Sequence, residues 1–396
     1  MTMIALARGA VGASVPVPAP VPAGDAALDF IARTRFDRPT LVIDSARIRA
    51  QYDALVEGLA GAHIHYAVKA NPAPAILRLL AERGAGFDAA SRAEIEMCLA
   101  AGARPEMISF GNTIKKPADI AHAWRAGVRL FAADAAEELD KIAEHAPGAR
   151  VYLRIIVENC QADWPLTRKF GCAPQALPGL LDHAVARGLT PVGLSFHVGS
   201  QTREARFWAP VLDQVATLWH QARSDGHKLS LLNIGGGFPA FYDQPVEAPR
   251  AYAAGVLALV RERFGDVEIM AEPGRGLVAE AGHIAAEVVL VSRKSPSDLH
   301  RWVYLDIGKF SGLAETMDEA IRYTIDTPHD GGETGPCILA GPSCDSADVL
   351  YERRPMQLPL ALRAGDRVVI RNCGAYTSTY ASVGFNGFPP LDVIVL

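Results

Sequence analysis

The sequence predicts an α/β protein in which a (β/α)8 barrel of the TIM type is followed by an all-β C-terminal domain. From about residue 60 to residue 275, eight short apolar runs alternate with stretches of helical periodicity. This alternation is typical of a barrel of parallel strands covered by helices. After about residue 282 the helical stretches give way to successive β-rich segments. A chain of 396 residues is long enough to fold as two domains.

The eight predicted barrel strands each combine a short apolar core with polar residues near the C-terminal end. They are residues 63–69, 86–90, 107–111, 128–134, 150–157, 189–200, 229–237 and 267–275. Helical patterns such as 72–84 and 91–102 lie between them. The second of these opens on Ser91 with Glu94 three residues later, which is the spacing of a capping box.

The predicted C-terminal domain spans residues 283–396, after a barrel domain at 46–282. Its strand candidates are residues 283–294, 301–308, 336–344, 365–372 and 391–396. The apolar run at 39–45 falls outside the count of eight barrel strands. We therefore expect residues 26–45 to pair with the β-domain across the chain.

Residues 1–25 predict a disordered leader. Arg8 and Gly9 interrupt its short apolar run, and a tract of Pro, Ala and Val follows, whereas a signal peptide has an uninterrupted apolar stretch. No later segment is long and apolar enough to span a bilayer. The sequence thus favours a cytoplasmic protein without a membrane partner.

Composition narrows the classes of partner further. The formal net charge of −5 provides no basic surface for nucleic acid or for an anionic membrane. The six cysteines are scattered without paired spacing, so neither a disulfide framework nor a metal site is expected. A small molecule or a second protein subunit is the natural partner.

Lys69 ends the apolar strand "HIHYAVKANP" at residues 63–72. A surface lysine at a strand end commonly extends to solvent, whereas a lone buried ammonium is costly to desolvate. In a barrel, however, functional groups gather at the C-terminal ends of the strands. Asp88, His197 and Glu272 fall at such ends as well, and this shared placement favours a functional lysine.

A phosphate-binding region is predicted around the glycine run "NIGGGFP" at 233–239. Bare backbone N–H groups there can approach a phosphate closely, although a glycine run alone more often forms a tight turn. Arg275 of "AEPGRG" and Ser200 of "HVGS" add a guanidinium and a hydroxyl. A strand-end lysine, a phosphate cradle and a buried carboxylate are the groups that pyridoxal phosphate requires.

With these motifs the chain resembles the ornithine decarboxylase group of pyridoxal-phosphate enzymes, which have an alanine-racemase-like barrel, and in particular its short bacterial members. The matching motifs run in the family's order from residue 66 to residue 388: "YAVKANP", "FDAAS", "GNTIKK", "RKFG", "SFHVGSQ", "IGGGFP", "AEPGR", "GPSCDSAD" and "GAYTSTYASVGFNGF". The ordered set is far more specific than any single motif.

The resemblance implies a role for each matching residue. Lys69 would form the Schiff base with pyridoxal 5'-phosphate, His197 would stack on its ring, and Glu272 would contact the pyridine nitrogen. The remaining cofactor-binding residues that it implies are Asp88, Arg154, Ser200, Gly236, Gly237, Gly274, Arg275 and Tyr376.

The resemblance also implies a homodimer whose active sites are shared across the interface. Cys344 would donate a proton in the partner's site, and Asp345 would bind the distal ammonium of the substrate. Phe385 of "FNGF" would line the substrate site. The segment "GLAETMDEAIRY" lacks the Tyr-Asp pair of eukaryotic relatives, and an ungapped alignment places Glu319 near that aspartate, with Asp318 and Glu315 as neighbours.

The implied activity is decarboxylation of a basic L-amino acid, foremost L-ornithine to putrescine in polyamine biosynthesis. Lysine is the next candidate, and arginine, diaminobutyrate and diaminopimelate remain alternatives. A glutamate at the ring nitrogen favours decarboxylation over racemisation, because it keeps the ring charged as an electron sink. The alternative from another class is a catalytically silent regulatory homologue. Single residues also have structural alternatives: His197 as a core histidine, Cys344 as a buried apolar side chain, and Asp345 and Asp348 as turn formers.

Overall fold

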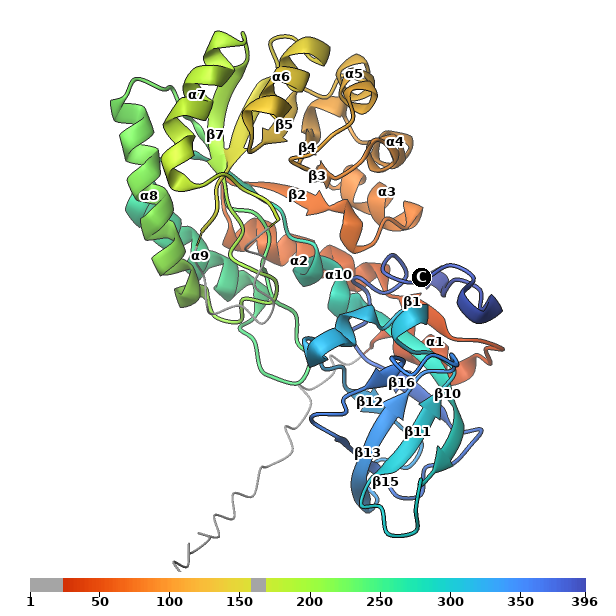
Figure 1. Cartoon of the computed structure of the whole chain (residues 1–396). Coiled ribbons are helices and arrows are strands. Elements are labelled where there is room, and N and C mark those ends of the chain that lie inside the picture. The colour runs from red at the N-terminus through yellow and green to blue at the C-terminus, as the bar shows by residue number, and fades with distance from the viewer. Residues whose placement is uncertain (1–23, 158–168) are drawn as a thin grey trace, which may run out of the picture.

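The structure is a computed structural model that describes residues 24–157 and 169–396. It consists of a barrel, in the upper part of Figure 1, and a β-sheet domain below it. Most of the predicted leader and Cys160 lie outside the described residues.

Eight parallel strands close the barrel in chain order, because the first strand pairs with the second and also with the last. They are β2 (His63–Ala67), β3 (Gly86–Ala89), β4 (Ile108–Phe110), β5 (Leu130–Ala133), β6 (Arg150–Arg154), β7 (Thr190–Ser195), β8 (Leu231–Asn233) and β9 (Glu268–Ala271). The predicted fold class is confirmed. The strands are shorter than the apolar runs, because the last residues of several runs leave the sheet as loops.

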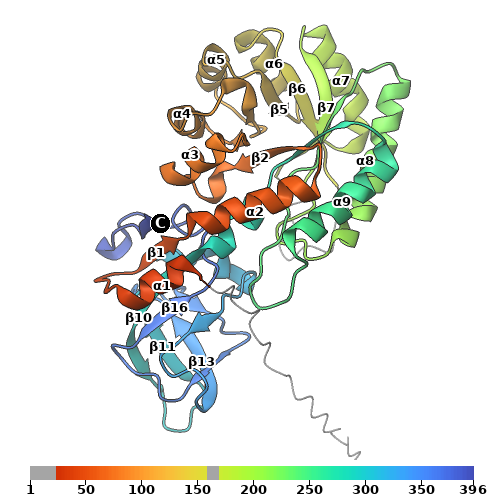
Figure 2. The ribbon, with the colours of Figure 1, turned by 180° about the vertical axis from the view of Figure 1, so that it is seen from behind.

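Helices surround the barrel strands, as the two opposite views in Figures 1 and 2 show. Their bounds are α2 (Ser45–Gly58), α3 (Pro74–Glu82), α4 (Arg92–Ala100), α5 (Pro117–Arg125), α6 (Ala136–His145), α7 (Leu177–Ala186), α8 (Ala209–Ser224), α9 (Pro249–Phe264) and α10 (Arg275–Val278). Ser91 caps α4, as its hydroxyl accepts a hydrogen bond from the Glu94 N–H at 3.2 Å. The Glu94 carboxylate accepts from the N–H of Ala90, one residue before the cap.

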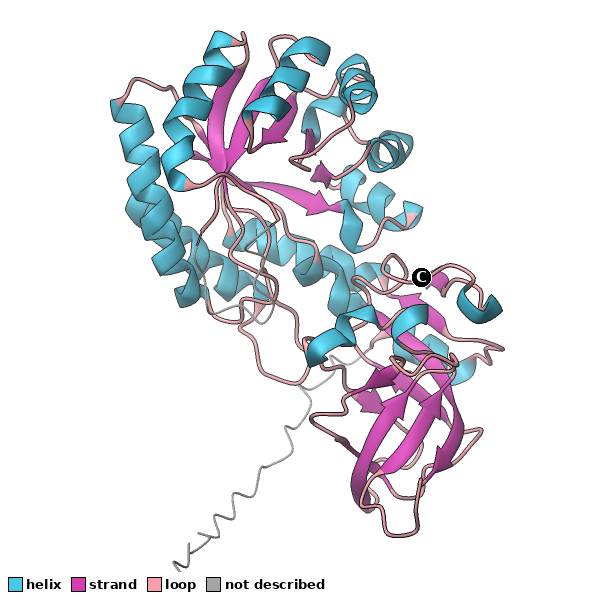
Figure 3. Ribbon diagram, in the orientation of Figure 1, coloured by secondary structure: helices cyan, strands magenta, loops and turns pink. Residues whose placement is uncertain are grey.

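The second domain is built on a nine-stranded sheet (Figure 3). Its strands are β1 (Thr40–Ile43), β10 (Gly282–Ser292), β11 (Arg301–Leu305), β12 (Ile325–Asp326), β13 (Thr334–Ala340), β14 (Val349–Leu350), β15 (Met356–Pro359), β16 (Arg367–Ile370) and β17 (Asp392–Val395). The main order is β12-β16-β10-β11-β13-β14, with β15 on β13. Pattern analysis misses β12 and β14, which are two residues long, and β15, which ends in proline.

The first strand of the chain belongs to this second domain. β1 pairs antiparallel with β10 and parallel with β17, and helix α1 (Ala26–Arg33) packs beside it. From β1 the chain therefore passes out of the sheet into the barrel and returns to the sheet through β10.

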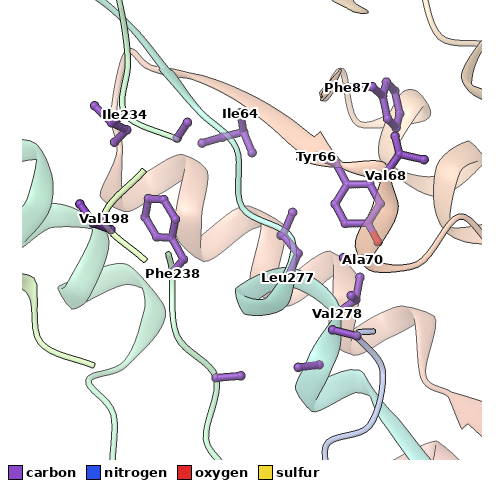
Figure 4. Packing of buried hydrophobic residues seen from close by; sticks show 14 of the residues in the cluster. Ile64, Tyr66, Val68, Ala70, Phe87, Val198, Ile234, Phe238, Leu277 and Val278 are labelled. Carbon is purple, nitrogen blue, oxygen red and sulfur yellow. The ribbon is translucent and has the colours of Figure 1, made fainter. Parts of the chain in front are cut away.

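One apolar core continues from the barrel into the sheet domain. Figure 4 shows Tyr66, Val68 and Ala70, from the end of β2, together with Leu277 and Val278 of α10. This packing fixes the backbone around Lys69. Among the described residues, no helix combines the length and the apolar character needed to cross a membrane.

Candidate active site

Lys69 lies in a single 3₁₀ turn, Val68–Ala70, directly after β2. Val68 and Ala70 on either side of it are buried in the core. The Lys69 side chain instead lines a pocket and is accessible to solvent. The sheet domain holds this turn from the other side. The N–H of Tyr376 donates to the Ala70 carbonyl at 2.9 Å, and the Thr379 hydroxyl donates to the Lys69 carbonyl at 3.1 Å.

The pocket at Lys69 lies at the C-terminal ends of the barrel strands. It brings together all of the predicted cofactor-binding residues except Arg154. Its lining consists of Ala67, Lys69, Asp88, His197, Ser200, Gly236, Gly237, Phe238, Glu272, Gly274, Arg275 and Tyr376. The lining residues from Ala67 to Arg275 meet because parallel strands of a barrel all end at the same face, whereas Tyr376 comes from the sheet domain, more than 300 positions after Lys69.

Two carboxylates lie in this pocket, Asp88 buried and Glu272 partly buried. Burial, with the neighbouring charge of Asp88, raises the pKa of Glu272, although the Asn233 amide donates to Glu272 Oε1 at 2.6 Å and opposes the shift. Burial likewise raises the pKa of Asp88, against the charges of Lys69 and Arg154. Among the described residues, Asp88 Oδ1 has no hydrogen-bond partner. A buried acceptor without a partner marks a place where a ligand can supply a donor.

The pKa values of Lys69 and His197 are shifted in opposite directions. Burial lowers the pKa of Lys69, but Tyr376, Asp88 and Glu272 outweigh this effect and the pKa is raised overall. Burial and the cations Arg154 and Lys69 hold the pKa of His197 well below its usual range. His197 Nδ1 accepts a hydrogen bond from the Gly199 N–H at 2.9 Å, which fits the neutral imidazole.

Arg275 and Ser200 form the polar end of the pocket. The guanidinium of Arg275 is buried and lies 3.1–3.3 Å from the Ser200 hydroxyl. Gly237 approaches them with φ +101°, and a Cβ there would lie 2.5 Å from Val198 Cγ2. Only glycine adopts this backbone without strain, so the loop can bring bare N–H groups close to an anion. Tyr376 is held at φ +55°, a conformation uncommon for an aromatic residue.

This set of groups fits pyridoxal phosphate. The pocket offers an accessible lysine amine, a carboxyl of raised pKa for a ring nitrogen, and a guanidinium, hydroxyl and glycine loop for a phosphate. The unpartnered Asp88 Oδ1 provides a further acceptor. The roles of the individual residues remain predictions.

Arg154 ends β6 but does not line the pocket. Its guanidinium lies 5.2 Å from the centroid of the Phe170 ring. Its charge still lowers the pKa of His197. It can therefore act on the pocket only through the electrostatic field or through neighbouring side chains.

Cys344, Asp345 and Phe385 do not line the pocket of their own chain. They lie on the sheet domain, where Cys344 and Asp345 are exposed in the loop between β13 and β14. The Cys344 N–H donates to Asn386 Oδ1 at 3.2 Å, and Asp345 Oδ1 accepts from the Ala347 N–H at 2.8 Å. The Phe385 ring contacts Phe310 at a centroid distance of 4.9 Å. Asp345 thus forms a turn within its own chain.

The acidic residues of "GLAETMDEAIRY" lie in a 3₁₀ segment, Ala314–Glu319, and bind arginine groups. Glu319, at φ +57°, accepts from the Arg353 N–H at 2.6 Å and forms an ion pair with Arg354 at 3.3 Å. Glu315 binds Arg275, with the closest contact at 2.6 Å. Neither glutamate lines the Lys69 pocket.

Sequence reasoning missed Asn233 and Tyr242, which hold the site in place, and placed a third such residue, Glu315, near the substrate's distal amine instead. Asn233 hydrogen-bonds Glu272, while Tyr242 and Glu315 bind the guanidinium of Arg275. Only Asn233 has a signal in the sequence, since it opens the motif "NIGGGFP" at the end of an apolar run. Glu315 reaches Arg275 only through the packing of the two domains, whereas Tyr242 lies in the barrel's own loop between β8 and α9.

Comparison with known proteins places this geometry in a family. Residues 45–279 match the family described as "Pyridoxal-dependent decarboxylase, pyridoxal binding domain". The chain is 33% identical over 355 residues to the lysine/ornithine decarboxylase of Selenomonas ruminantium, covering 89% of this chain and 88% of the relative. It is also 33% identical over 339 residues to antizyme inhibitor 2 of Xenopus laevis, covering 82% and 73%.

A solved structure agrees with these sequence matches. The lysine/ornithine decarboxylase of Vibrio vulnificus, solved with cadaverine, superposes with a TM-score of 0.83 at 33% identity, covering 93% of this chain and 97% of that chain. The similarity extends over both the barrel and the sheet domain. The chain therefore belongs to the family of pyridoxal-dependent decarboxylases and is a pyridoxal-phosphate-dependent amino-acid decarboxylase of the ornithine decarboxylase group.

Proposed function

We propose that the protein decarboxylates a basic L-amino acid, with L-ornithine as the leading substrate and putrescine as the product. The observation that carries the proposal is the single pocket that joins Lys69, Glu272 and Arg275 at the strand ends. Lysine is the second candidate substrate. A role in polyamine biosynthesis follows from the proposed product, and a cytoplasmic location is part of the same proposal.

The cofactor, when bound, supplies an electron sink that stabilises the negative charge left on the α-carbon as carbon dioxide departs. Lys69 would hold its aldehyde group through Nζ, and Arg275, Ser200 and Gly237 would hold its phosphate. Glu272, whose pKa is raised, would share a proton with the ring nitrogen. His197, whose pKa is held well below its usual range, would stack on the ring as an uncharged imidazole.

We assign the last proton transfer and the substrate's distal end to a second copy of the chain. Cys344 Sγ of that copy donates a proton to the α-carbon, and its Asp345 binds the distal ammonium, with Phe385 beside it. Both Cys344 and Asp345 are exposed on the surface of their own chain, which supports a role outside it. We prefer Asp345 over Glu319, because the Glu319 carboxylate already accepts hydrogen bonds from Arg353 and Arg354.

The test of substrate choice is carbon dioxide release from the purified protein with pyridoxal phosphate. Ornithine, lysine, arginine, diaminobutyrate and diaminopimelate are compared at equal concentration. We expect ornithine to react fastest and Lys69→Ala to abolish release. Asp345→Ala should raise KM for ornithine and lysine, since a buried ammonium without its carboxylate is costly, whereas Asp182→Ala on the outer helix α7 should not. Preference for diaminopimelate would contradict the assignment of a cationic distal group.

The shared site has its own test. Lys69→Ala and Cys344→Ala proteins, each nearly inactive, are mixed under conditions of subunit exchange. Random exchange makes half of the dimers mixed, each with one intact site, so activity should recover to roughly a quarter of wild type. No recovery despite demonstrated exchange would mean that both residues serve one chain's own site.

A catalytically silent regulator is the second candidate, favoured by the match to antizyme inhibitor 2. The presence of Lys69, Glu272 and Cys344 together argues against it. Absence of carbon dioxide release from every substrate, with no absorbance change on adding pyridoxal phosphate, would favour the regulator instead.

A further inference from the structure

Arg275 is held from behind by a carboxylate of the other domain. Arg275 begins α10, directly after the last barrel strand, and Glu315 lies in the segment between β11 and β12. Both residues are buried, with exposed fractions of 4% and 5%. Glu315 Oε1 accepts from Nη2 at 2.6 Å and Oε2 from Nη1 at 2.7 Å. This is the two-point contact in which a carboxylate fixes the plane of a guanidinium.

The remaining donors of Arg275 point in two other directions. Nε and Nη2 donate to the Ser200 hydroxyl at 3.3 and 3.1 Å, and Nη1 donates to the Tyr242 hydroxyl at 2.8 Å. Arg275 and Ser200 line the Lys69 pocket, whereas Glu315 and Tyr242 do not. The edge formed by Nε and Nη2 therefore faces the pocket, and Glu315 occupies the edge that faces away.

We propose that Glu315 is a positioning residue for the cofactor phosphate, acting through Arg275. This inference rests on the proposed role of Arg275 in the site. A free arginine side chain loses rotamer entropy when it is fixed on a ligand, and Glu315 fixes it beforehand. Glu315 also gives the buried guanidinium a counter-charge before a phosphate binds.

The same carboxylate has an opposing electrostatic effect, which makes the sign of the experiment informative. A negative charge behind Arg275 weakens the attraction of the site for a phosphate dianion. If positioning dominates, removing the charge weakens cofactor binding. If the field dominates, removing it tightens binding.

The experiment titrates cofactor-free full-length protein with pyridoxal phosphate and, in parallel, with pyridoxal, and follows the visible absorbance. Glu315→Gln keeps the size of the side chain but turns an amide N–H toward the guanidinium. We expect the Kd for pyridoxal phosphate to rise about tenfold, with the Kd for pyridoxal unchanged. Glu315→Asp keeps the charge on a shorter side chain and should give a smaller rise. It serves as the test variant if Glu315→Gln does not fold by circular dichroism.

Glu280→Gln is the matched control, because Glu280 also pairs with an arginine, Arg47, at 3.0 Å but lies outside the pocket lining. Neither Kd should change in this variant. Arg275→Ala tests the proposed role of Arg275 in binding the phosphate. It should raise the Kd for pyridoxal phosphate and leave the Kd for pyridoxal unchanged. If it does not, the proposed site itself is wrong.

The inference alone fails if Arg275→Ala weakens phosphate-dependent binding while Glu315→Gln leaves the Kd unchanged or lowers it. It also fails if Glu315→Gln weakens the binding of pyridoxal phosphate and of pyridoxal equally, because the effect would then not depend on the phosphate group.

Discussion

Replacing Asn233 by aspartate places a second carboxylate against Glu272. Asn233 is fully buried at the end of β8, where its amide nitrogen donates to Glu272 Oε1 at 2.6 Å and its amide oxygen accepts from the Gly235 N–H at 2.9 Å. Asn233→Asp keeps the acceptor for Gly235 and has nearly the same volume. The substitution therefore removes only the donor to Glu272 and adds a charge.

The cost can be worked out from these contacts. A hydrogen bond to an ionised carboxylate contributes about 2 kcal/mol, and burying a second, unpaired carboxylate adds to its loss. We expect the free energy of unfolding to fall by about 3 kcal/mol or more at pH 8. Neighbouring carboxyls share a proton, so the folded-state pKa of the pair lies above that of the unfolded chain. The folded variant then binds more protons than the unfolded variant. Its loss in free energy of unfolding relative to wild type therefore becomes smaller as the pH falls from 8 toward 5.

The assay is urea unfolding of the cofactor-free protein between pH 5 and pH 8, with wild type measured alongside because the pKa of its Glu272 is also raised. The double variant Asn233→Asp/Glu272→Gln restores one donor and one acceptor and should recover most of the stability at pH 8. A single variant within about 0.5 kcal/mol of wild type, with a parallel pH profile, would refute the assigned contact.

Three further predictions concern the frame of the site. A Cβ at Gly111 would lie 1.8 Å from Asp88 Oδ1, so Gly111→Ala should cost about 2 kcal/mol in urea unfolding, whereas Gly179→Ala, in open space on α7, should not destabilise. Burial lowers the pKa of His65 to about 4. Lowering the pH from 7.5 to 4.5 should therefore reduce the free energy of unfolding of wild type by about 2.5 kcal/mol more than that of His65→Leu. Equal losses in the two proteins would contradict this prediction. Asp348→Ala removes a buried acceptor of three hydrogen bonds, from Lys309 and Ser343, and should lower the thermal midpoint of unfolding. An unchanged midpoint would show that these hydrogen bonds do not stabilise the fold.

The barrel could be predicted from the sequence because its signal is local and repeated. Each strand–helix unit shows its own change of periodicity, and parallel strands bring their C-terminal ends to one face. That rule alone brings Lys69, Asp88 and Glu272 together once the strands are identified. The short strands β12 and β14 carry no such signal, because two residues cannot establish a period.

The acidic segment at 314–319 shows what sequence patterns could not provide. Asp318 and Glu319 both have positive φ, at 53° and 57°, so their side chains do not follow the spacing of a regular helix. Glu319 turns to Arg353 and Arg354, and Glu315 turns to Arg275. An ungapped alignment assigns residues to positions along the chain, but it cannot assign the direction in which a strained turn points them.

The contacts around Lys69 indicate that the barrel does not complete the site alone. Gly374, Tyr376 and Thr379 of the sheet domain hydrogen-bond the segment 69–71, and Glu315 of the same domain binds Arg275, which also lines the pocket. The sheet domain thus orients groups that the barrel presents. Because its contacts reach both the lysine turn and the guanidinium, a small rotation between the domains would displace the two together. The continuous apolar core between barrel and sheet, which resists such a rotation, therefore serves the geometry of the site as well as the stability of the fold.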